Sequence, residues 1–333
     1  MATADHLKAL IRSHADGDEE RFYTIAMQVA AQEARQGHTK FAQELRDLVD
    51  KAKGRPKAAT TGQRTKPVPI IQPRGELAGL LSASYPDNRL SELSLDDATR
   101  SRIDRILLEQ RNRKTILEHG MQPIRKLLLV GPPGTGKTST AAVLAGELGL
   151  PLFTIQLDGL ITKYLGETAA KLRLIFEAIQ QTRAVYFFDE FDALGGERGA
   201  KNDVGEIRRV LNSFLQFLEQ DESDSIIVAA TNHPQILDRA LFRRFDSVIE
   251  YQLPSRAVVE KVIQSRLALL DTSQIEWSKA LDATEGLSHS DLTRACEHAA
   301  KNAILQKNFI ISTSDLIDAL TERRVLHKQT LGS

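Results

Sequence analysis

The sequence LLLVGPPGTGKT, at residues 127–138, decides the fold of this chain. Its first four residues are apolar and predict a buried strand. Residues 131–138 match the pattern G-x-x-x-x-G-K-[ST], and residues 139–148 after them are predicted as a helix. A strand, a glycine-rich turn and a helix in this order predict a phosphate-binding loop. The turn directs backbone N–H groups inward, and the helix N-terminus adds a positive dipole.

Each part of this phosphate loop, residues 131–138, has an expected role. Lys137 is expected to reach the β- and γ-phosphates of a nucleotide, and the Thr138 hydroxyl to bind Mg²⁺. The alternative, a purely structural glycine turn, is disfavoured because chance rarely places the fixed residues between a strand and a helix. The predicted nucleotide-binding residues of the loop are Gly131, Pro132, Pro133, Gly134, Thr135, Gly136, Lys137 and Thr138.

Two carboxylates follow a second apolar run. Residues 185–188 predict a buried strand, and Asp189 and Glu190 come directly after it. The C-terminal ends of parallel strands meet at one edge of a sheet, so both acids are expected beside the phosphate loop. Asp189 is expected to hold Mg²⁺ through water, and Glu190 to orient or deprotonate the attacking water.

The order of the elements predicts an α/β fold. Apolar runs at 152–157, 226–230 and 248–251 bring the predicted strands to five, and helical patterns such as 169–181 alternate with them. This alternation predicts a five-stranded parallel sheet covered by helices on both faces. Residues 77–253 are therefore expected to form a large α/β domain. After Pro254 only helical patterns occur, and residues 254–333 are expected to form a small all-α domain.

The N-terminal region differs in composition. Residues 1–53 predict short helices that recruit a substrate or partner, and residues 54–76 predict a basic, proline-containing linker. The linker is expected to be a tether, and contact with an acidic partner or nucleic acid is the alternative.

Charge and cysteine content limit the classes of function. The 44 basic residues balance the 44 acidic ones, which removes the whole-chain argument for binding nucleic acid or an anionic membrane. The single cysteine, Cys296, cannot form an internal disulfide and is expected to be a packed thiol. No apolar run is long enough to span a membrane, so a cytoplasmic protein is expected.

Taken together, these motifs resemble the AAA+ ATPases over roughly residues 77–325, in the AAA clade of katanin-like and spastin-like remodellers and proteasomal ATPases. The resemblance implies a P-loop NTPase sheet with a helical lid, and ATP and Mg²⁺ as ligands. It also implies that Asn232, after the run 226–230, helps to place the lytic water. Arg243 and Arg244 would reach the γ-phosphate of a neighbouring subunit and stabilise the transition state in trans.

The resemblance further implies a homo-hexameric ring that acts on a protein substrate. Lys163, Tyr164 and Leu165 match the pore loop, whose aromatic residue grips a polypeptide in the central channel. At the lid segment that abuts the base and ribose, His289 and Ser290 replace the expected glycine and alanine. His289 is expected either to contact the nucleotide or to cap its helix alongside Asp291.

The function implied is ATP hydrolysis coupled to remodelling, unfolding or threading of proteins. One alternative is a regulatory subunit that uses ATP as a switch and delivers clients to a separate peptidase or effector. The other is a nucleic-acid motor, for which the basic linker is the only support. A polynucleotide translocator would be expected to have basic pore loops, so the aromatic loop at residues 163–166 favours a polypeptide.

Overall fold

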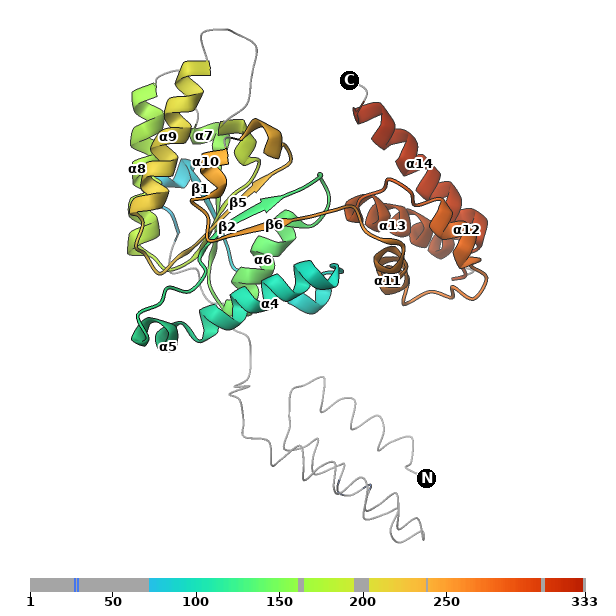
Figure 1. Cartoon of the computed structure of the whole chain (residues 1–333). Coiled ribbons are helices and arrows are strands. Elements are labelled where there is room, and N and C mark those ends of the chain that lie inside the picture. The colour runs from blue at the N-terminus through green and yellow to red at the C-terminus, as the bar shows by residue number, and fades with distance from the viewer. Residues whose placement is uncertain are drawn as a thin grey trace. The chain divides into compact units, whose positions relative to one another are not determined.

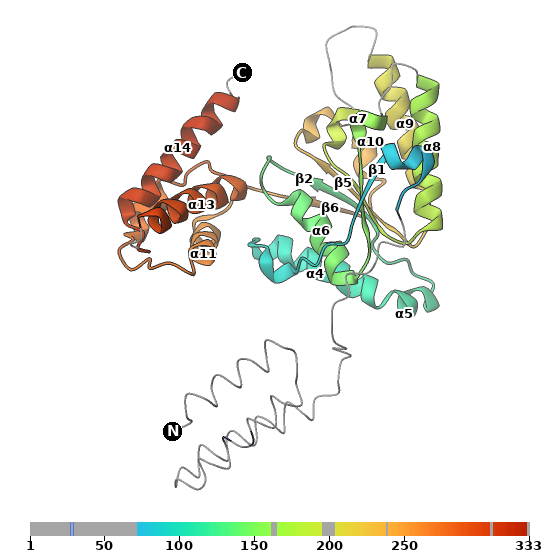
Figure 2. The ribbon, with the colours of Figure 1, turned by 180° about the vertical axis from the view of Figure 1, so that it is seen from behind.

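The computed structural model describes residues 72–160, 165–194, 204–237, 239–306 and 309–331, together with Met27 and Val29. The chain separates into two compact units, Met1–Val68 and Pro69–Ser333. Apart from Met27 and Val29, every described residue belongs to the second unit (Figures 1 and 2). The helices predicted within 1–53 and most of the linker 54–76 lie outside the described residues and stay predictions.

A six-stranded sheet forms the centre of the α/β domain, with the order β1-β3-β4-β5-β2-β6 (Figure 1). The five expected strands are all present, and each pairs in parallel with its neighbours among them. The strands are β1 (Leu81–Ser84), β2 (Lys126–Val130), β3 (Leu152–Ile155), β4 (Val185–Phe188), β5 (Ile226–Thr231) and β6 (Ser247–Glu250).

The sixth strand, β1, is absent from the sequence prediction of five parallel strands. It lies at the edge of the sheet and pairs antiparallel with β3, where Leu81 faces Ile155. Only Leu81 of its four residues is buried. A short edge strand with one buried residue carries too little apolar pattern to be recognised from sequence.

Helices cover both faces of the sheet, as predicted. On one face α4 (Asp97–Arg111) and α6 (Lys137–Leu148) pack with one group of buried residues. On the other face α8 (Leu165–Gln181) and α9 (Val204–Gln220) pack with a second group. The shorter helices of this domain are α5 (Arg113–Glu118), α7 (Leu157–Leu160) and α10 (Arg239–Phe242).

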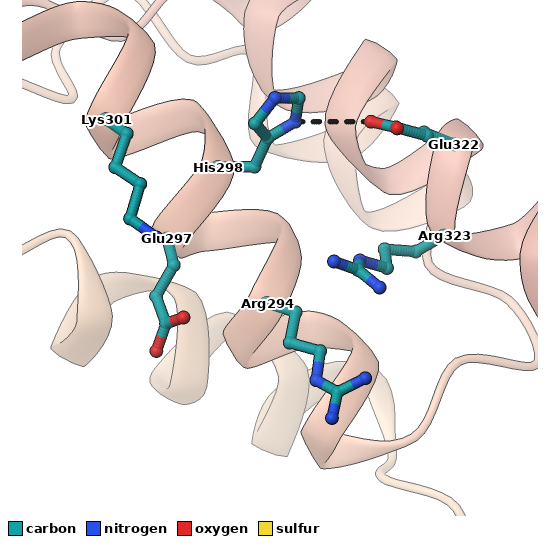
Figure 3. Close-up of a pocket in the computed structure, with 6 residues that line it drawn as sticks. All are labelled: Arg294, Glu297, His298, Lys301, Glu322 and Arg323. Carbon is teal, nitrogen blue, oxygen red and sulfur yellow. Dashed lines mark ion pairs between the residues drawn. The ribbon is translucent and has the colours of Figure 1, made fainter.

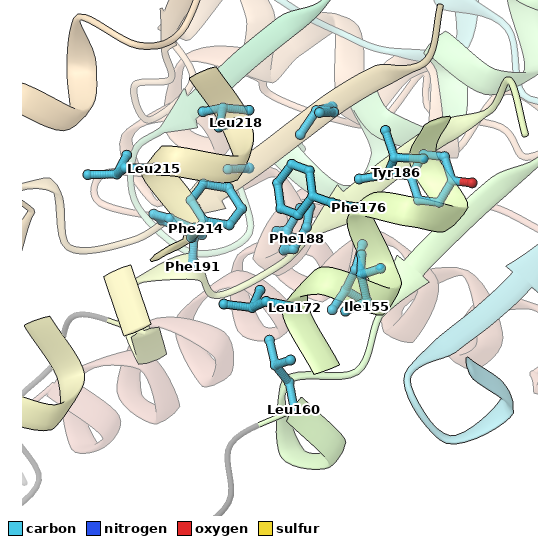
Figure 4. Close-up of a cluster of buried hydrophobic side chains, with 14 of the residues drawn as sticks. Ile155, Leu160, Leu172, Phe176, Tyr186, Phe188, Phe191, Phe214, Leu215 and Leu218 are labelled. Carbon is cyan, nitrogen blue, oxygen red and sulfur yellow. The ribbon is translucent and has the colours of Figure 1, made fainter. Parts of the chain in front are cut away.

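An aromatic cluster fixes the end of β4 on the α8–α9 side (Figure 4). The Phe214 ring, from α9, lies edge-on to Phe188 with 5.1 Å between ring centroids, and its centroid is 4.7 Å from that of Phe191. Ring pairs of this kind contribute about 0.5–1.5 kcal/mol each beyond burial. Since Phe188 precedes Asp189 and Phe191 follows Glu190, the cluster holds the backbone on both sides of the two acids.

The residues after Pro254 form a helical domain with a core of its own. Among the described residues it contains only helices and one isolated β-bridge, in agreement with the prediction. Cys296 is buried there, and burial raises the pKa of its thiol to about 12, so the thiol stays neutral and packed as expected. The helices are α11 (Arg256–Arg266), α12 (Trp277–Asp282), α13 (His289–Leu305) and α14 (Thr313–Leu331).

None of the helices in the described ranges combines the length and the apolar character that a bilayer crossing requires.

Candidate nucleotide site

The phosphate loop joins β2 directly to α6, in the strand–turn–helix order that the sequence predicts. Gly131 and Gly134 are required by close approach of other segments. A Cβ on Gly131 would lie 2.3 Å from the carbonyl oxygen of Tyr251, and one on Gly134 would lie 2.5 Å from Oγ of Ser288. Gly134 also has a φ of +73°, which side chains other than glycine rarely adopt. The N-terminus of α6, which begins at Lys137, therefore faces a loop that can bind anions with its backbone.

Lys137 is buried inside the loop that it is expected to serve. Its Nζ donates hydrogen bonds to the carbonyl oxygens of Gly131, at 2.7 Å, and Pro132, at 2.8 Å. Burial lowers the pKa of the Lys137 ammonium, and the carboxylates of Asp189 and Asp192 oppose this. The positive charge of Lys137 is thus bonded to two neutral carbonyl oxygens. A charged phosphate oxygen would form a stronger hydrogen bond with it than either carbonyl does.

The two sequence motifs meet at one hydrogen bond. The hydroxyl of Thr138, at the start of α6, donates to Oδ2 of Asp189, after β4, at 2.9 Å. β4 and β2 are both neighbours of β5 in the sheet, which brings the ends of the two strands to the same edge. A hydroxyl and a carboxylate oxygen side by side are hard oxygen ligands of the kind that Mg²⁺ prefers. Thr138 and Asp189 therefore fit the predicted Mg²⁺ role.

Glu190 is exposed and has an unusual backbone conformation. Its φ is +48°, in the left-handed region, and its backbone N–H donates to Oδ1 of Asp189 at 3.0 Å. For a residue other than glycine this conformation costs about 1–3 kcal/mol and persists only where the surroundings impose it. The buried Phe188 and Phe191 on either side provide that constraint. The chain turns sharply here, and the Glu190 carboxylate is left accessible to water.

Asn232 lies just beyond β5 and is held by an acid that the sequence analysis did not select. Oδ1 of Asp192 accepts a hydrogen bond from the Thr231 hydroxyl at 2.9 Å and one from the Asn232 backbone N–H at 3.3 Å. Asp192 therefore ties the segment after Glu190 to the segment that carries Asn232. The one sequence signal for it is an additional acid two positions after Glu190, which by itself is typical of a polar turn.

The two predicted arginines have different surroundings. Arg243 is exposed, whereas Nε of Arg244 lies 2.5 Å from Oε1 of Glu219, near the end of α9. Both arginines follow α10, between that helix and β6. Within one chain, Arg244 thus has an acidic partner, whereas Arg243 is an exposed residue.

The predicted pore loop is only partly described. Lys163 and Tyr164 lie outside the described residues, and Leu165 is the first residue of α8. The role of all three residues stays a prediction.

The start of α13 contacts the phosphate loop. The backbone N–H of Ser290 donates to the carbonyl oxygen of Gly134 at 3.1 Å. Asp291 takes part in the cap of α13, as one of the two alternatives expected, but its partner is Ser288 and not His289. The side chains and backbone of Ser288 and Asp291 bond reciprocally in a capping box. This contact brings the helical domain onto the loop at the position where the sequence places the lid segment.

His289 connects the helical domain to the segment ahead of α4. Its Nε2 lies 2.8 Å from the carbonyl oxygen of Ser94. Because a carbonyl only accepts, Nε2 carries the hydrogen, and Nδ1 of the neutral ring is an acceptor. Nδ1 is buried and has no hydrogen-bond partner among the described residues. Burial lowers the pKa of the His289 imidazole, while the Ser94 carbonyl and the Asp96 charge oppose this.

A polar hollow between α13 and α14 lies apart from these residues (Figure 3). In it, Nδ1 of His298 lies 3.2 Å from Oε2 of Glu322. All its lining residues belong to the helical domain, and none is a predicted site residue. They are Arg294, Glu297, His298, Lys301, Glu322 and Arg323.

Comparisons with known proteins identify the family of the chain. Residues 127–253 match the model of a family described as ATPase family associated with various cellular activities (AAA). Over 322 residues, which are 97% of this chain and 96% of the relative, the chain is 32% identical to an uncharacterized AAA family ATPase, y4kL, of Sinorhizobium fredii. The family match spans all the predicted nucleotide-site residues, from Gly131 to Arg244.

Two further relatives are matched over part of their length. A proteasome-activating nucleotidase of Methanothermobacter thermautotrophicus is 36% identical over 228 residues, which are 64% of this chain and 55% of that protein. An ATP-dependent zinc metalloprotease FtsH of Thermobaculum terrenum is 36% identical over 219 residues, which are 62% of this chain and 32% of that protein. This chain thus spans about half of the first protein and a third of the second.

A solved structure shares the fold. The crystal structure of the FIGL-1 AAA domain superposes with a TM-score of 0.60 and 22% sequence identity, over 77% of this chain and 91% of that one. At this identity the likeness concerns the fold alone. It confirms the α/β sheet and the helical region after it.

Proposed function

The chain belongs to the AAA family of ATPases, and from this membership we propose that it hydrolyses ATP with Mg²⁺ and uses the energy to remodel, unfold or thread a protein substrate. The observation that carries the proposal is the 2.9 Å hydrogen bond between Thr138 and Asp189. It joins the residue that ends the phosphate loop to the acid that follows β4, which supports the proposal that the two motifs act together in one phosphoryl-transfer site.

The phosphate loop binds and orients the nucleotide. Backbone N–H groups of the loop and of the start of α6 receive the β- and γ-phosphates. Lys137 exchanges the carbonyl oxygens of Gly131 and Pro132 for phosphate oxygens, since hydrogen bonds between two charged groups are about twice as strong as neutral ones. Thr138, and Asp189 through water, would hold Mg²⁺, which when bound would neutralise charge on the phosphate oxygens.

The attacking water is activated on the side of the γ-phosphate that faces away from the β-phosphate. Glu190 accepts the proton of the attacking water, and its exposed carboxylate has access to that water before the site closes. Asn232 orients the same water. Asp192 keeps Asn232 in place through the backbone hydrogen bond at 3.3 Å.

The site is completed by a second copy of the chain in a homo-hexameric ring. Arg243 reaches the γ-phosphate bound to the neighbouring subunit and stabilises the charge of the transition state. Arg244 joins it after leaving Glu219. Such ion pairs near the surface are worth about 0–1 kcal/mol, so a phosphate can displace the carboxylate at small cost.

The first experiment measures hydrolysis with the full chain. Wild-type protein should release phosphate from Mg-ATP, whereas Glu190→Gln should bind ATP and lose about 100- to 10,000-fold in turnover because the water has no base. Glu222→Gln, which changes an exposed acid outside the site, is the matched control and should keep full turnover. Undiminished turnover in Glu190→Gln removes Glu190 from this role, and a wild type without turnover rejects the hydrolysis itself.

The second experiment asks what the energy acts on. Tyr164→Ala should keep basal ATP turnover. It should stop the ATP-dependent loss of fluorescence of a folded fluorescent protein that carries an unfolded tail, because the ring would no longer grip the substrate polypeptide. Unchanged processing would reject the pore-loop role. Stimulation of turnover by single-stranded DNA, and not by polypeptide, would favour a nucleic-acid motor instead.

A second candidate function draws on the names of two relatives, a proteasome-activating nucleotidase and a metalloprotease. In this version the chain uses ATP to deliver clients to a separate peptidase or effector. Stoichiometric recovery of a peptidase with Glu190→Gln, combined with no processing by the purified ATPase alone, would favour it. Processing by the purified chain would favour the first candidate.

A further inference from the structure

Tyr251 lies directly behind the phosphate loop, although its sequence position suggests only the end of a strand. It follows β6 and is 5% exposed. Its backbone N–H donates to the carbonyl oxygen of Val130 at 2.6 Å. Its own carbonyl oxygen lies 2.3 Å from where a Cβ on Gly131 would be. The backbone of Tyr251 therefore packs against the first residue of the loop.

The side chain of Tyr251 reaches the other end of the loop through one intermediate. Its hydroxyl oxygen is 2.7 Å from Oγ1 of Thr140, a fully buried residue of α6. Oγ1 of Thr140 donates to the carbonyl oxygen of Gly136 at 3.0 Å. Gly136 is the last loop residue before α6 and has a φ of +103°.

The carbonyl oxygen of Gly136 determines which group donates and which accepts in this series of hydrogen bonds. The Gly136 carbonyl can only accept, so the single hydroxyl hydrogen of Thr140 is used there. The hydrogen between Thr140 and Tyr251 must then come from the phenol. Burial raises the pKa of Tyr251 to about 12, so the phenol remains a donor at any working pH. The order is Tyr251 to Thr140 to Gly136.

We propose that Tyr251 is a positioning residue of the nucleotide site, which fixes both ends of the phosphate loop and joins them to the segment that leads to the helical domain. The backbone of Tyr251 holds the Gly131 end, and its hydroxyl holds the Gly136 end through Thr140. Only residues 252–255 separate Tyr251 from α11, the first helix of the helical domain. A residue that orders the loop before the ligand arrives lowers the entropic cost of binding.

This proposal rests on the proposed ATPase function, because it assumes that a nucleotide occupies the loop. Tyr251→Phe keeps the ring and its packing and removes only the hydroxyl. The dissociation constant of a fluorescent ATP analogue and the KM for ATP should each rise about 3- to 10-fold, the effect expected of one hydrogen bond. kcat should stay within about twofold, since the loop binds the ground state and the transition state alike.

Tyr186→Phe is the matched control. Tyr186, in β4, is 1% exposed, and its hydroxyl donates to the carbonyl oxygens of Ala178, at 2.8 Å, and Thr182, at 3.2 Å, in and just after α8. This variant also loses buried hydrogen bonds of a phenol, but none that lead to the phosphate loop. It should lower the melting temperature and leave KM and the dissociation constant unchanged.

A double-mutant cycle with Thr140→Val tests the connection itself. Tyr251→Phe/Thr140→Val should bind nucleotide no worse than the weaker single variant, because both changes break the same chain of hydrogen bonds. Unchanged binding in Tyr251→Phe, an equal loss in Tyr186→Phe, or fully additive losses in the cycle would each overturn the proposal. Wild-type binding and turnover are measured in the same series, so failure of the ATPase function is seen separately from failure of Tyr251.

Discussion

Replacing Phe214 should separate the stability of the chain from the placement of its catalytic acids. Phe214 is completely buried on the α8–α9 face and contacts the rings of Phe188 and Phe191, which flank Asp189 and Glu190. Phe214→Ala leaves a cavity at this position. We expect turnover to fall because the left-handed conformation at Glu190 depends on these two rings for support.

The magnitude follows from burial. Truncating a fully buried phenylalanine to alanine costs about 3–5 kcal/mol. In a domain of this size each kcal/mol lowers the melting temperature by about 2–4 °C, so a decrease of about 6–20 °C is expected. Circular dichroism during heating measures the decrease, and phosphate release well below the transition measures kcat on folded protein.

The control is a cavity of comparable cost on the opposite face of the sheet. Ile103, in α4, is also completely buried, and Ile103→Ala should cost about 2–5 kcal/mol. Ile103 belongs to the buried group on the α4–α6 face, which does not contain Phe214 or the two rings that it contacts. We expect kcat to fall in Phe214→Ala and to stay close to wild type in Ile103→Ala. Equal loss of kcat in both variants, or none in Phe214→Ala, would refute the argument that this packing positions the acids.

Three further predictions concern single contacts. Asp192→Ala should lower kcat at least tenfold with little change in nucleotide affinity, because Asn232 loses its backbone partner; equal losses in both constants would contradict this. Burial lowers the pKa of His289 in the folded protein, so the unfolded chain takes up a proton more readily. The neutral imidazole therefore contributes fully to the stability of the fold above the unfolded pKa of about 6.5. This contribution decreases as the pH falls from there toward the lower pKa of the folded state. His289→Gln should therefore reduce the loss of melting temperature between pH 7.5 and 5.5, and an unchanged loss would exclude His289 as its source. Mixing Arg243→Ala with Lys137→Ala subunits should recover part of the turnover, and no recovery in proven mixed rings would count against completion of the site in trans.

Short-range pattern was sufficient to predict the sheet and the phosphate loop. Residues 127–130 of β2 and all of β4 are continuous apolar runs. The motif at 131–138 predicts the turn after β2 because each of its fixed positions has a local steric or chemical reason. β1 was missed for the opposite reason. An edge strand needs few buried residues, and its pairing with β3 depends on a register that a single short segment does not reveal.

The missed site residues share a different property. Thr140 and Tyr251 are 111 positions apart. His289 was selected from the sequence, but its partner Ser94, which is 195 positions away, was not. A hydroxyl or imidazole at such a distance matches no local motif, since its partner is chosen by the fold. Asp192 is close to Glu190 in sequence, but an acid in a turn has many uses. Its role became visible only when Thr231 and Asn232 were found at its carboxylate.

The carbonyl groups of the phosphate loop offer a route by which the helical domain can respond to nucleotide. Gly131 and Pro132 accept hydrogen bonds from Lys137, and Gly134 accepts one from Ser290 at the start of α13. A phosphate draws Lys137 away from its two carbonyls because the charged partner is stronger. The loop that Ser290 contacts would then lose the hydrogen bonds from Lys137 to the carbonyl oxygens of Gly131 and Pro132. The space around Gly134 is too small for a methyl group, so any shift of the loop toward Ser288 and Ser290 would require the start of α13 to move with it.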